Sequence, residues 1–484
     1  MNSIRRAALG ALALAGASVF AAAPAANAQT TNFTTDTVID YELPGYYHAL
    51  DTHSPFTLEV TTNGVVGEGT IYGANTMLFT GGRSQGPINL NDTARIIVRD
   101  GSQVTGTYGS LYANDKSAVA VEGGTVGDIY LTINTTQTVQ ATANISGGRV
   151  SVLDVGKNSA ATVSGGYVGS IFVDGAFTVT GGTFGDVNLN AGCVPNLAAG
   201  TTFQTLNVGT DTTLTGINAA QMNAVGQVSV VDGTYGALGM NNGSGYDRIT
   251  LGGAGLVADR IQGQADAVVI TGGTFGRGGS GNDAAYLSFN QTVSVSGGAF
   301  LSAFHTEYAP RVSVSGGSFT DFVAENGTGF SMTGGAISGT LAVGGRYDLA
   351  TADISGGTIH DLFLNNNASV TVRGGIISPN TIRTASGVLN ARLDFVGADF
   401  ALVADGTDAG GAFQYLLTGT LQNGDALHTR FVTDVAVGDP GGARLSANGV
   451  TLSPVAAPES GTAGLLVAGG LLFVASRRLR SVRA

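Results

Sequence analysis

The fold is decided by a pattern that is clearest at residues 163–173, VSGGYVGSIFV. Apolar residues alternate with small or polar ones, a Gly-Gly pair interrupts them, and the alternation then resumes. Variants of this segment recur about every 16 to 25 residues along most of the chain. A β-type period repeated at this spacing is typical of stacked β-repeat proteins, in which each repeat packs only on its neighbours.

Three apolar columns emerge when the Gly-Gly pair, or its Asp-Gly and Ala-Gly variants, is used as the marker for alignment. The first column lies two and four residues before the marker, as in Val119 and Val121, and has the period of a strand with one buried face. The second column lies three residues after the marker, as in Val126, and the third lies six and eight residues after it, as in Ile129 and Leu131. We predict that all three columns point into one continuous core.

These columns predict an all-β chain folded as a single-stranded parallel β-helix with three strands per coil and about sixteen coils. We expect a right-handed coil, from the usual sense of parallel β connections. The Gly-Gly pair should form a corner, because glycine adopts positive φ and lets neighbouring coils approach closely. Strands about 4.8 Å apart would then build a rod on the order of 75 Å long. The bare strand edges at its two ends should carry small β caps.

Composition restricts the partners. The net charge is −12, and six of the 22 basic residues lie in residues 1–28 and 460–484, which carry no acid, so the rest of the chain is strongly acidic. An acidic body repels nucleic acid, and we expect no nucleic-acid partner. The single cysteine, Cys193, excludes an intramolecular disulfide and is expected to be a small buried filler.

The two ends resemble targeting segments. Residues 1–28 contain Arg5-Arg6, an apolar run and the sequence Ala26-Asn27-Ala28, and they predict a signal peptide cleaved by signal peptidase. Residues 458–484 contain Pro458-Glu459-Ser460, an apolar stretch over 461–475 and a cluster of arginines. The apolar stretch predicts a short transmembrane helix with the basic end in the cytoplasm. We therefore divide the chain into a signal peptide (1–28), an N-terminal cap (29–63), β-helix repeats (64–384), a C-terminal β segment (385–457) and a sorting tail (458–484).

The tail resembles the PEP-CTERM sorting signal of Gram-negative bacteria, in which a Pro-Glu-Pro motif precedes an apolar helix and terminal arginines. Here the motif residues are Pro458, Glu459 and Ser460, so serine replaces the final proline. The resemblance implies export across the inner membrane, processing by an exosortase, and a location at the cell surface or in the extracellular polysaccharide matrix. A permanent single-span anchor is the alternative.

Candidate catalytic acids lie five residues after the marker, at Asp128, Asp186, Asp321 and Asp361. Asp321 and Asp361 are two coils apart, near 10 Å, which is within the spread of the two carboxylates of an inverting glycosidase. The competing interpretation is turn chemistry, in which an aspartate bonds its own backbone. We favour the turn interpretation and assign no catalytic residue.

Candidate ligands for a metal ion are few. Histidines stand near acids in His305 with Glu307, in His360 with Asp361, and in the trio His48, Asp51 and His53. None of these groups has a complete ligand set at metal spacing. Residues 278–283, GGSGND, match the start of a calcium-binding nonapeptide, and residues 243–247 resemble it weakly, but one copy cannot complete a calcium cage. We predict neither a metal nor a cofactor.

The function predicted from these features is that of an exported, non-enzymatic structural or adhesion protein, associated with exopolysaccharide or biofilm. Many weak contacts along a repetitive polar face would supply its affinity. The alternative is a β-helix polysaccharide lyase or glycoside hydrolase.

Overall fold

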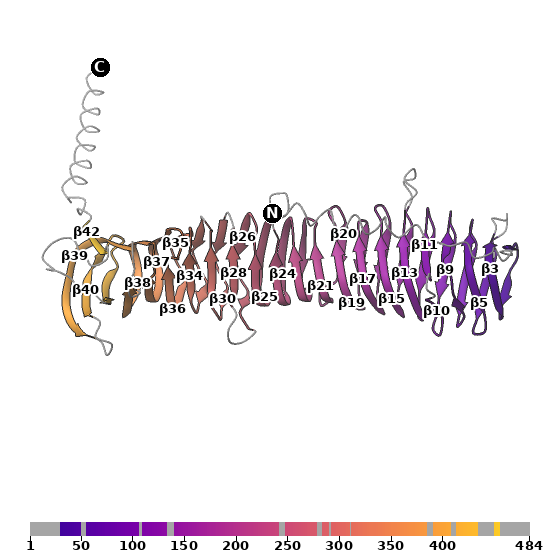
Figure 1. Ribbon diagram of the computed structural model, residues 1–484, viewed down its shortest axis with the longest axis horizontal. Helices are drawn as coiled ribbons and strands as arrows, with labels where there is room; N and C mark the ends of the chain where they lie inside the picture. The colour runs from indigo at the N-terminus through magenta and orange to yellow at the C-terminus, as the bar shows by residue number, and fades with distance from the viewer. Residues whose placement is uncertain are drawn as a thin grey trace, which may run out of the picture.

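The repeats fold into a parallel β-solenoid of about 17 turns over the described part of the chain, as the sequence predicts. In the computed structural model, successive turns stack along one axis into a long rod, with the indigo N-terminal strands at one end and the orange C-terminal strands at the other (Figure 1). The structure describes residues 30–49, 55–105, 109–132, 140–241, 247–277, 283–289, 292–309, 311–384, 391–407, 413–433 and 450–454. The hand of the coil stays a prediction.

The quoted segment shows how one turn is built. Strand β16 (Ala160–Val163) forms the first face, Gly165 and Gly166 form a corner, and β17 (Tyr167–Val173) forms the second and third faces. Pairing of β17 with its neighbour skips Gly169, where the second face gives way to the third. Each turn therefore has three inward-facing segments, which we call the first, second and third faces.

The strand bounds follow this plan along the chain. One sheet of the described residues contains the first-face strands β2 (Thr37–Ile39), β4 (Thr57–Thr61), β6 (Thr76–Thr80), β9 (Arg95–Val98), β12 (Ala118–Val121), β14 (Thr142–Ile145), β16, β18 (Ala176–Val179) and β20 (Val194–Leu197). The other faces of these turns are formed by β1 (Thr30–Phe33), β3 (Glu42–Ala49), β5 (Val65–Ile71), β7 (Arg83–Ser84), β8 (Ile88–Leu90), β10 (Gln103–Val104), β11 (Ser110–Ala113), β13 (Thr125–Leu131), β15 (Arg149–Val155), β17, β19 (Thr183–Leu189), β21 (Thr202–Val208) and β23 (Asn218–Ala224). The later turns contain β22 (Thr212–Thr215), β24 (Gln227–Met240), β25 (Arg248–Gly263), β26 (Ala267–Ile270), β27 (Thr274–Phe275), β28 (Ala285–Ser288), β29 (Thr292–Val295), β30 (Ala299–Phe300), β31 (Phe304–Glu307), β32 (Val312–Val314), β33 (Ser318–Phe319), β34 (Phe322–Glu325), β35 (Gly329–Met332), β36 (Ala336–Val343), β37 (Ala350–Leu364) and β38 (Ala368–Thr384).

The Gly-Gly corner needs both glycines. Gly335 has φ of +89°, a backbone conformation that favours glycine. At Gly334 a Cβ would lie 2.5 Å from the carbonyl oxygen of Ser315 in the preceding turn. Gly335 therefore makes the bend, and both glycines allow the close stacking of turns, since a Cβ on Gly335 would also lie 3.0 Å from the Gly316 backbone in the preceding turn.

The three predicted columns form the core. Their residues are buried and aligned by strand register, so that on the second face Val126 pairs with Val150 and Val150 pairs with Val168. Phenylalanines replace the aliphatic residues later in the same column. Phe300 lies between the rings of Phe275 and Phe319, with ring centroids 5.0 and 4.7 Å apart.

The first face is interrupted once within the described turns. The sheet that begins at β2 ends at β20, and β22 pairs with β24 in the other sheet. The second and third faces continue through this point, because β19 pairs with β21 and β21 pairs with β23. Strand β20 is poorly buried and contains Val194, whose side chain is 68% exposed.

The two ends of the rod differ. Residues 30–63 extend the coil, since β1 pairs with β3 and β3 with β5 in parallel register, and buried Tyr47 fills the first turns. At the other end β39 (Arg392–Thr407), β40 (Phe413–Leu421) and β41 (Ala426–Thr433) form an antiparallel meander, and β42 (Val450–Pro454) pairs with β39. This meander lies within residues 385–457, for which a β segment is predicted.

The turn between β40 and β41 attaches the meander to the last Gly-Gly corner. The backbone N–H of Gly375 donates a hydrogen bond of 2.7 Å to Asp425 Oδ2, and Asn423 Nδ2 donates one of 2.6 Å to the same oxygen. These two donors lower the pKa of the Asp425 carboxyl, with the larger contribution from Asn423. The exposed edge of the solenoid is therefore covered by a hairpin with a charge-assisted attachment.

Candidate functional site

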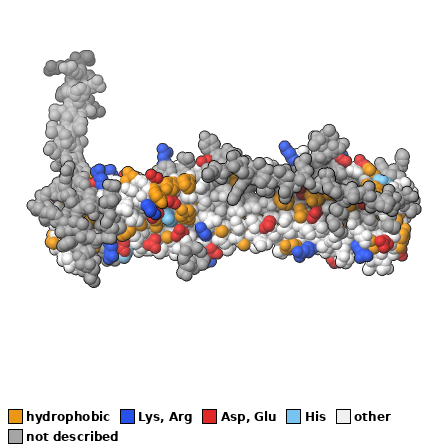
Figure 2. Space-filling model, viewed as in Figure 1, with side chains coloured by type: hydrophobic (Ala, Val, Ile, Leu, Met, Phe, Trp, Pro, Cys, Tyr) orange, Lys and Arg blue, Asp and Glu red, His pale blue; other side chains and the backbone are white. Residues whose placement is uncertain are grey.

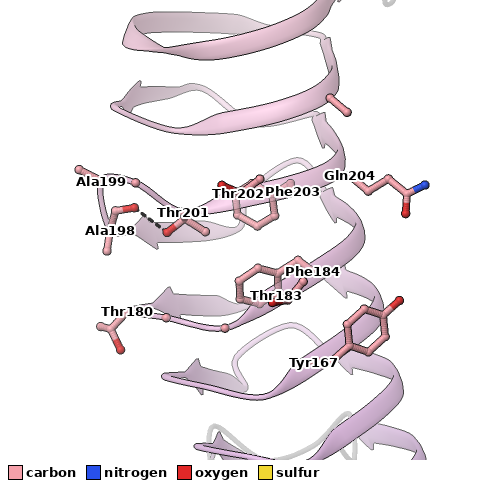
Figure 3. A pocket seen from close by; sticks show the side chains of 14 residues that line it. Tyr167, Thr180, Thr183, Phe184, Ala198, Ala199, Thr201, Thr202, Phe203 and Gln204 are labelled. Carbon is pink, nitrogen blue, oxygen red and sulfur yellow. Dashed lines mark hydrogen bonds between the residues drawn. The ribbon is translucent and has the colours of Figure 1, made fainter.

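A concavity of about 710 Å³ lies where the first face is interrupted (Figure 3). It runs along the glycine corner between the turns of β18 and β20. Figure 3 shows the rings of Phe184 and Phe203 in the interior, while Tyr167 and Gln204 point outward. Its lining consists of Tyr167, Thr180, Gly181, Gly182, Thr183, Phe184, Ala198, Ala199, Gly200, Thr201, Thr202, Phe203, Gln204 and Ala220.

The chemistry of this concavity is that of a neutral surface. Its side-chain polar groups are hydroxyls and one amide, and the hydroxyl of Thr201 donates to the carbonyl of Ala198 at 2.6 Å. The guanidinium of Arg149 lies 4.4 Å from the centroid of the Tyr167 ring and holds that ring at the rim. The lining contains no carboxylate and no histidine, and its one ionisable side chain is the phenol of Tyr167.

A second candidate site lies on the third face, around His305. The imidazole Nε2 lies 3.4 Å from Glu325 Oε2, and Nδ1 lies 3.7 Å from Asp283 Oδ2. The ring of Tyr286 packs edge-on against His305, and its hydroxyl donates a hydrogen bond of 2.7 Å to Glu307 Oε2. Three successive turns of the chain thus bring five ionisable groups together on one outward surface.

Electrostatics perturb two groups of this cluster. Burial lowers the pKa of His305, but the close contact of Nε2 with the Glu325 carboxylate and the charges of Glu325, Asp283 and Glu307 outweigh burial, and the net pKa is raised. The pKa of Tyr286 is raised to about 12, chiefly by its hydrogen bond to Glu307 and also by burial and nearby carboxylates. The charged form of His305 is therefore more stable than that of a free imidazole, and Tyr286 remains a phenol at neutral pH.

The acids predicted five residues after the marker do not form a facing pair. Thr340 lies between Asp321 and Asp361 in the ladder, and its backbone N–H donates a hydrogen bond of 2.7 Å to Asp321 Oδ1. Asp361 Oδ2 lies 3.1 Å from Nδ1 of the adjacent His360. Asp321 therefore has a structural role, as we favoured. Its hydrogen-bond partner is in the next coil, however, whereas we expected Asp321 to bond its own backbone.

Along the rod, side-chain oxygens of aspartate and asparagine repeatedly accept hydrogen bonds from backbone N–H groups of the next turn. Asp211 Oδ1 accepts from the backbone N–H of Gln227 at 2.9 Å, and Asn218 Oδ1 accepts from Thr234 at 2.8 Å. The other two acids of the predicted set lie in the same ladder position. Asp128 accepts a bond of 3.3 Å from the hydroxyl of Tyr130, and Asp186 lies in register between Ser170 and Thr205.

The histidine trio is described only in part. His48 lies in β3 against the ring of Tyr46, with centroids 4.9 Å apart, and Asp51 and His53 fall outside the described residues. Within the described ranges no group of three or more His, Cys, Asp or Glu side chains is arranged to hold a metal ion.

The calcium-like segments contribute single aspartates to other contacts. Residues 278–282 and 243–246 fall outside the described ranges. Asp283 faces His305, and buried Asp247 accepts a hydrogen bond of 2.7 Å from the backbone N–H of Gly226. Cys193 is buried as predicted, and burial raises the pKa of its thiol.

The predicted signal peptide and the sorting motif Pro458, Glu459 and Ser460 lie outside the described residues. In the part of the chain that the structure describes, no helix is long and apolar enough to span a membrane. Comparison with known proteins adds no relative, because no protein-family model, curated protein or solved structure matches this chain.

The sequence predicts that His305 lies beside Glu307, but Tyr286, Glu325 and Asp283 join them only in the folded chain. In the ladder Tyr286 pairs with His305, and Glu307 pairs with Glu325. Aligning the outward positions of the third face, and not only its inward column, would have brought these residues together.

Proposed function

We propose that this chain is an exported, non-enzymatic structural or adhesion protein of the cell surface or extracellular matrix, associated with exopolysaccharide. The observation that supports it is how the rod uses its outer polar groups. They bond between turns, as in the asparagine ladder in which Asn223 donates to Asn207 at 2.7 Å and Asn207 donates to Asn188 at 2.8 Å. An exterior of this kind stiffens a long, repetitive surface suited to many weak contacts.

The predicted export, processing and location of the protein are part of the same proposal. Export by the predicted signal peptide, removal of that peptide by signal peptidase and processing of the tail by an exosortase rest on the sequence resemblance. Intact-mass measurement of the protein recovered from its native host tests this. A mature mass that still includes residues 461–484 would contradict exosortase processing and favour a permanent anchor.

The alternative enzymatic function draws on the cluster around His305. A raised histidine pKa beside Glu325, together with a phenol bonded to Glu307, is a combination found at acid–base sites as well as in structural networks. A polysaccharide lyase or glycoside hydrolase would use such groups to abstract or donate a proton.

One experiment separates these functions. The purified full-length chain is incubated with a panel of neutral, acidic and amino polysaccharides, and binding and the release of new chain ends are measured in the same samples. We expect binding without new ends. Cleavage that is lost in Glu307→Gln or Glu325→Gln, or in Asp321→Asn or Asp361→Asn, would replace the adhesion proposal with an enzymatic one.

A further inference from the structure

Two aromatic residues occupy a backbone conformation that suits neither of them. At the corner that follows the third face, Phe289 has φ of +57° and Tyr308 has φ of +52°. The same corner in other turns holds Asp92, Asp115 and Asn158, with φ between +56° and +65°. Aspartate and asparagine tolerate this left-handed region, whereas bulky aromatic residues rarely adopt it.

The two aromatic residues belong to the regular ladder. The N–H of Phe289 donates to the carbonyl of Glu307 at 3.0 Å, and the N–H of Tyr308 donates to the carbonyl of Asn326 at 2.9 Å. Their rings stack with centroids 4.9 Å apart and planes 14° from parallel. The Phe289 side chain is 57% exposed, so burial in the core does not explain why the corner holds aromatic residues.

The turn after Tyr308 leaves a slot beside its ring. Asn326 lies in register with Tyr308 there, and at the following Gly327 a Cβ would lie 3.7 Å from Tyr308 Cδ1 and 3.8 Å from Asp348 Cβ. Tyr308 belongs to the preceding turn and Asp348 to the following one, so the two side chains stand on opposite sides of a bare glycine. One added carbon would already be in ordinary van der Waals contact with both side chains, so the slot is a single atomic layer deep, the thickness of one flat ring.

The far wall of the slot is polar and aromatic. It is formed by residues 346–348, in which the guanidinium of Arg346 lies 5.6 Å from the centroid of the Tyr347 ring. The Tyr347 side chain is 66% exposed, and its backbone N–H donates a hydrogen bond of 3.0 Å to Asn326 Oδ1. Figure 2 shows hydrophobic side chains gathered beside acidic groups and a histidine over the strands that Figure 1 labels β28 and β34.

We propose that Phe289, Tyr308 and the 346–348 corner form a binding site for one sugar ring of a neutral polysaccharide, with Gly327 as its floor. A pyranose has an apolar C–H face that packs on an aromatic ring and hydroxyls that bond to charged groups at its edge. Asp348 and Arg346 provide such groups, and Phe289 supports the tyrosine ring from the other side. This inference rests on the proposed association with polysaccharide and assigns it a site.

Charge selects among glycans. Asp283, Glu307 and Glu325 lie on the adjoining third face, and Asp348 lies at the slot itself. Uronate-rich polysaccharides would be repelled by these carboxylates. The site should therefore favour a neutral glucan over polygalacturonate.

The decisive variant is Tyr308→Asn. Asparagine is the residue found at this corner in other turns, so the variant removes the ring and keeps the backbone conformation. Affinity of the full-length chain for a soluble neutral glucan and for polygalacturonate is measured by calorimetry or affinity electrophoresis. Phe172→Ala is the matched control, because Phe172 is an aromatic residue 43% exposed on the third face of a distant turn.

We expect Tyr308→Asn to bind the neutral glucan about fivefold or more weakly, as loss of one stacked aromatic contact implies, while Phe172→Ala binds like the unaltered chain. Equal glucan binding by Tyr308→Asn and the unaltered chain would overturn this site and leave the proposed function standing. Preference for polygalacturonate would overturn the charge argument and the site with it. A chain that binds neither glycan would contradict both the site and the association with polysaccharide.

Discussion

Replacing Phe300 by alanine tests whether the stacked columns are the source of stability. Phe300 is 1% exposed and packs against Phe275, Phe304 and Phe319, with ring centroids 4.7 to 5.0 Å apart. Phe-to-Ala changes in cores cost about 3–5 kcal/mol, and each aromatic pair adds about 0.5–1.5 kcal/mol beyond buried area. With three ring partners lost, we expect a loss of about 5 kcal/mol in the free energy of unfolding.

The assay is hydrogen exchange of the full-length chain, resolved by peptide. A loss of about 5 kcal/mol corresponds to more than a thousandfold faster exchange for amides that open with the affected turns. Each repeat contacts only its neighbours, so the effect should be largest in β27, β30 and β33 and fade along the rod. Phe172→Ala serves as the control, with an expected change under about 0.5 kcal/mol. A cost for Phe300→Ala below about 1.5 kcal/mol, or one spread evenly over all turns, would refute the reasoning.

Three further predictions concern the corner, the histidine cluster and the C-terminal attachment. Gly335→Ala should lower the free energy of unfolding in urea by about 2–4 kcal/mol, and Gly200→Ala should lower it by about 1–2 kcal/mol. Both glycines have positive φ, but only a Cβ on Gly335 would lie within 4 Å of the backbone of the preceding turn. Equal losses would show that close stacking is unimportant. The raised pKa of His305 means that its ion pairs stabilise the fold fully below the ordinary histidine pKa and that this stabilisation is lost as pH rises through the folded value. Glu325→Gln should lower that pKa in an NMR titration, and an unchanged titration would exclude the ion pair. The lowered pKa of Asp425 means that its attachment stabilises the cap above the ordinary aspartate pKa and is lost as pH falls through the folded value. Hydrogen exchange of the backbone amides at the Gly374–Gly375 corner should therefore become faster in acid for the unaltered chain. The Asp425→Asn variant should show this faster exchange already at neutral pH.

The sequence predicts the buried core well, but it does not predict which groups meet on the outer surface. Every apolar residue used above to define the three columns is buried, because period-two alternation and the glycine marker are local signals that repeat at each turn. The acids five residues after the marker were expected to bond locally, but Asp321 bonds to Thr340 in the next turn. Spacing along the chain does not say which outward groups meet across turns.

The amino-acid sequence alone determined that the chain is a stack of three-sided coils with an aliphatic and aromatic interior and glycine corners. These features depend on local alternation and on the backbone freedom of glycine, which any one repeat already contains. Only the tertiary structure decided that the first face is interrupted after β20, that Tyr286 meets His305, and that Phe289 stacks on Tyr308 in a strained corner. The physical reason is that turns of unequal length bring residues about twenty positions apart into contact, and the register that aligns them is set by pairing between whole strands.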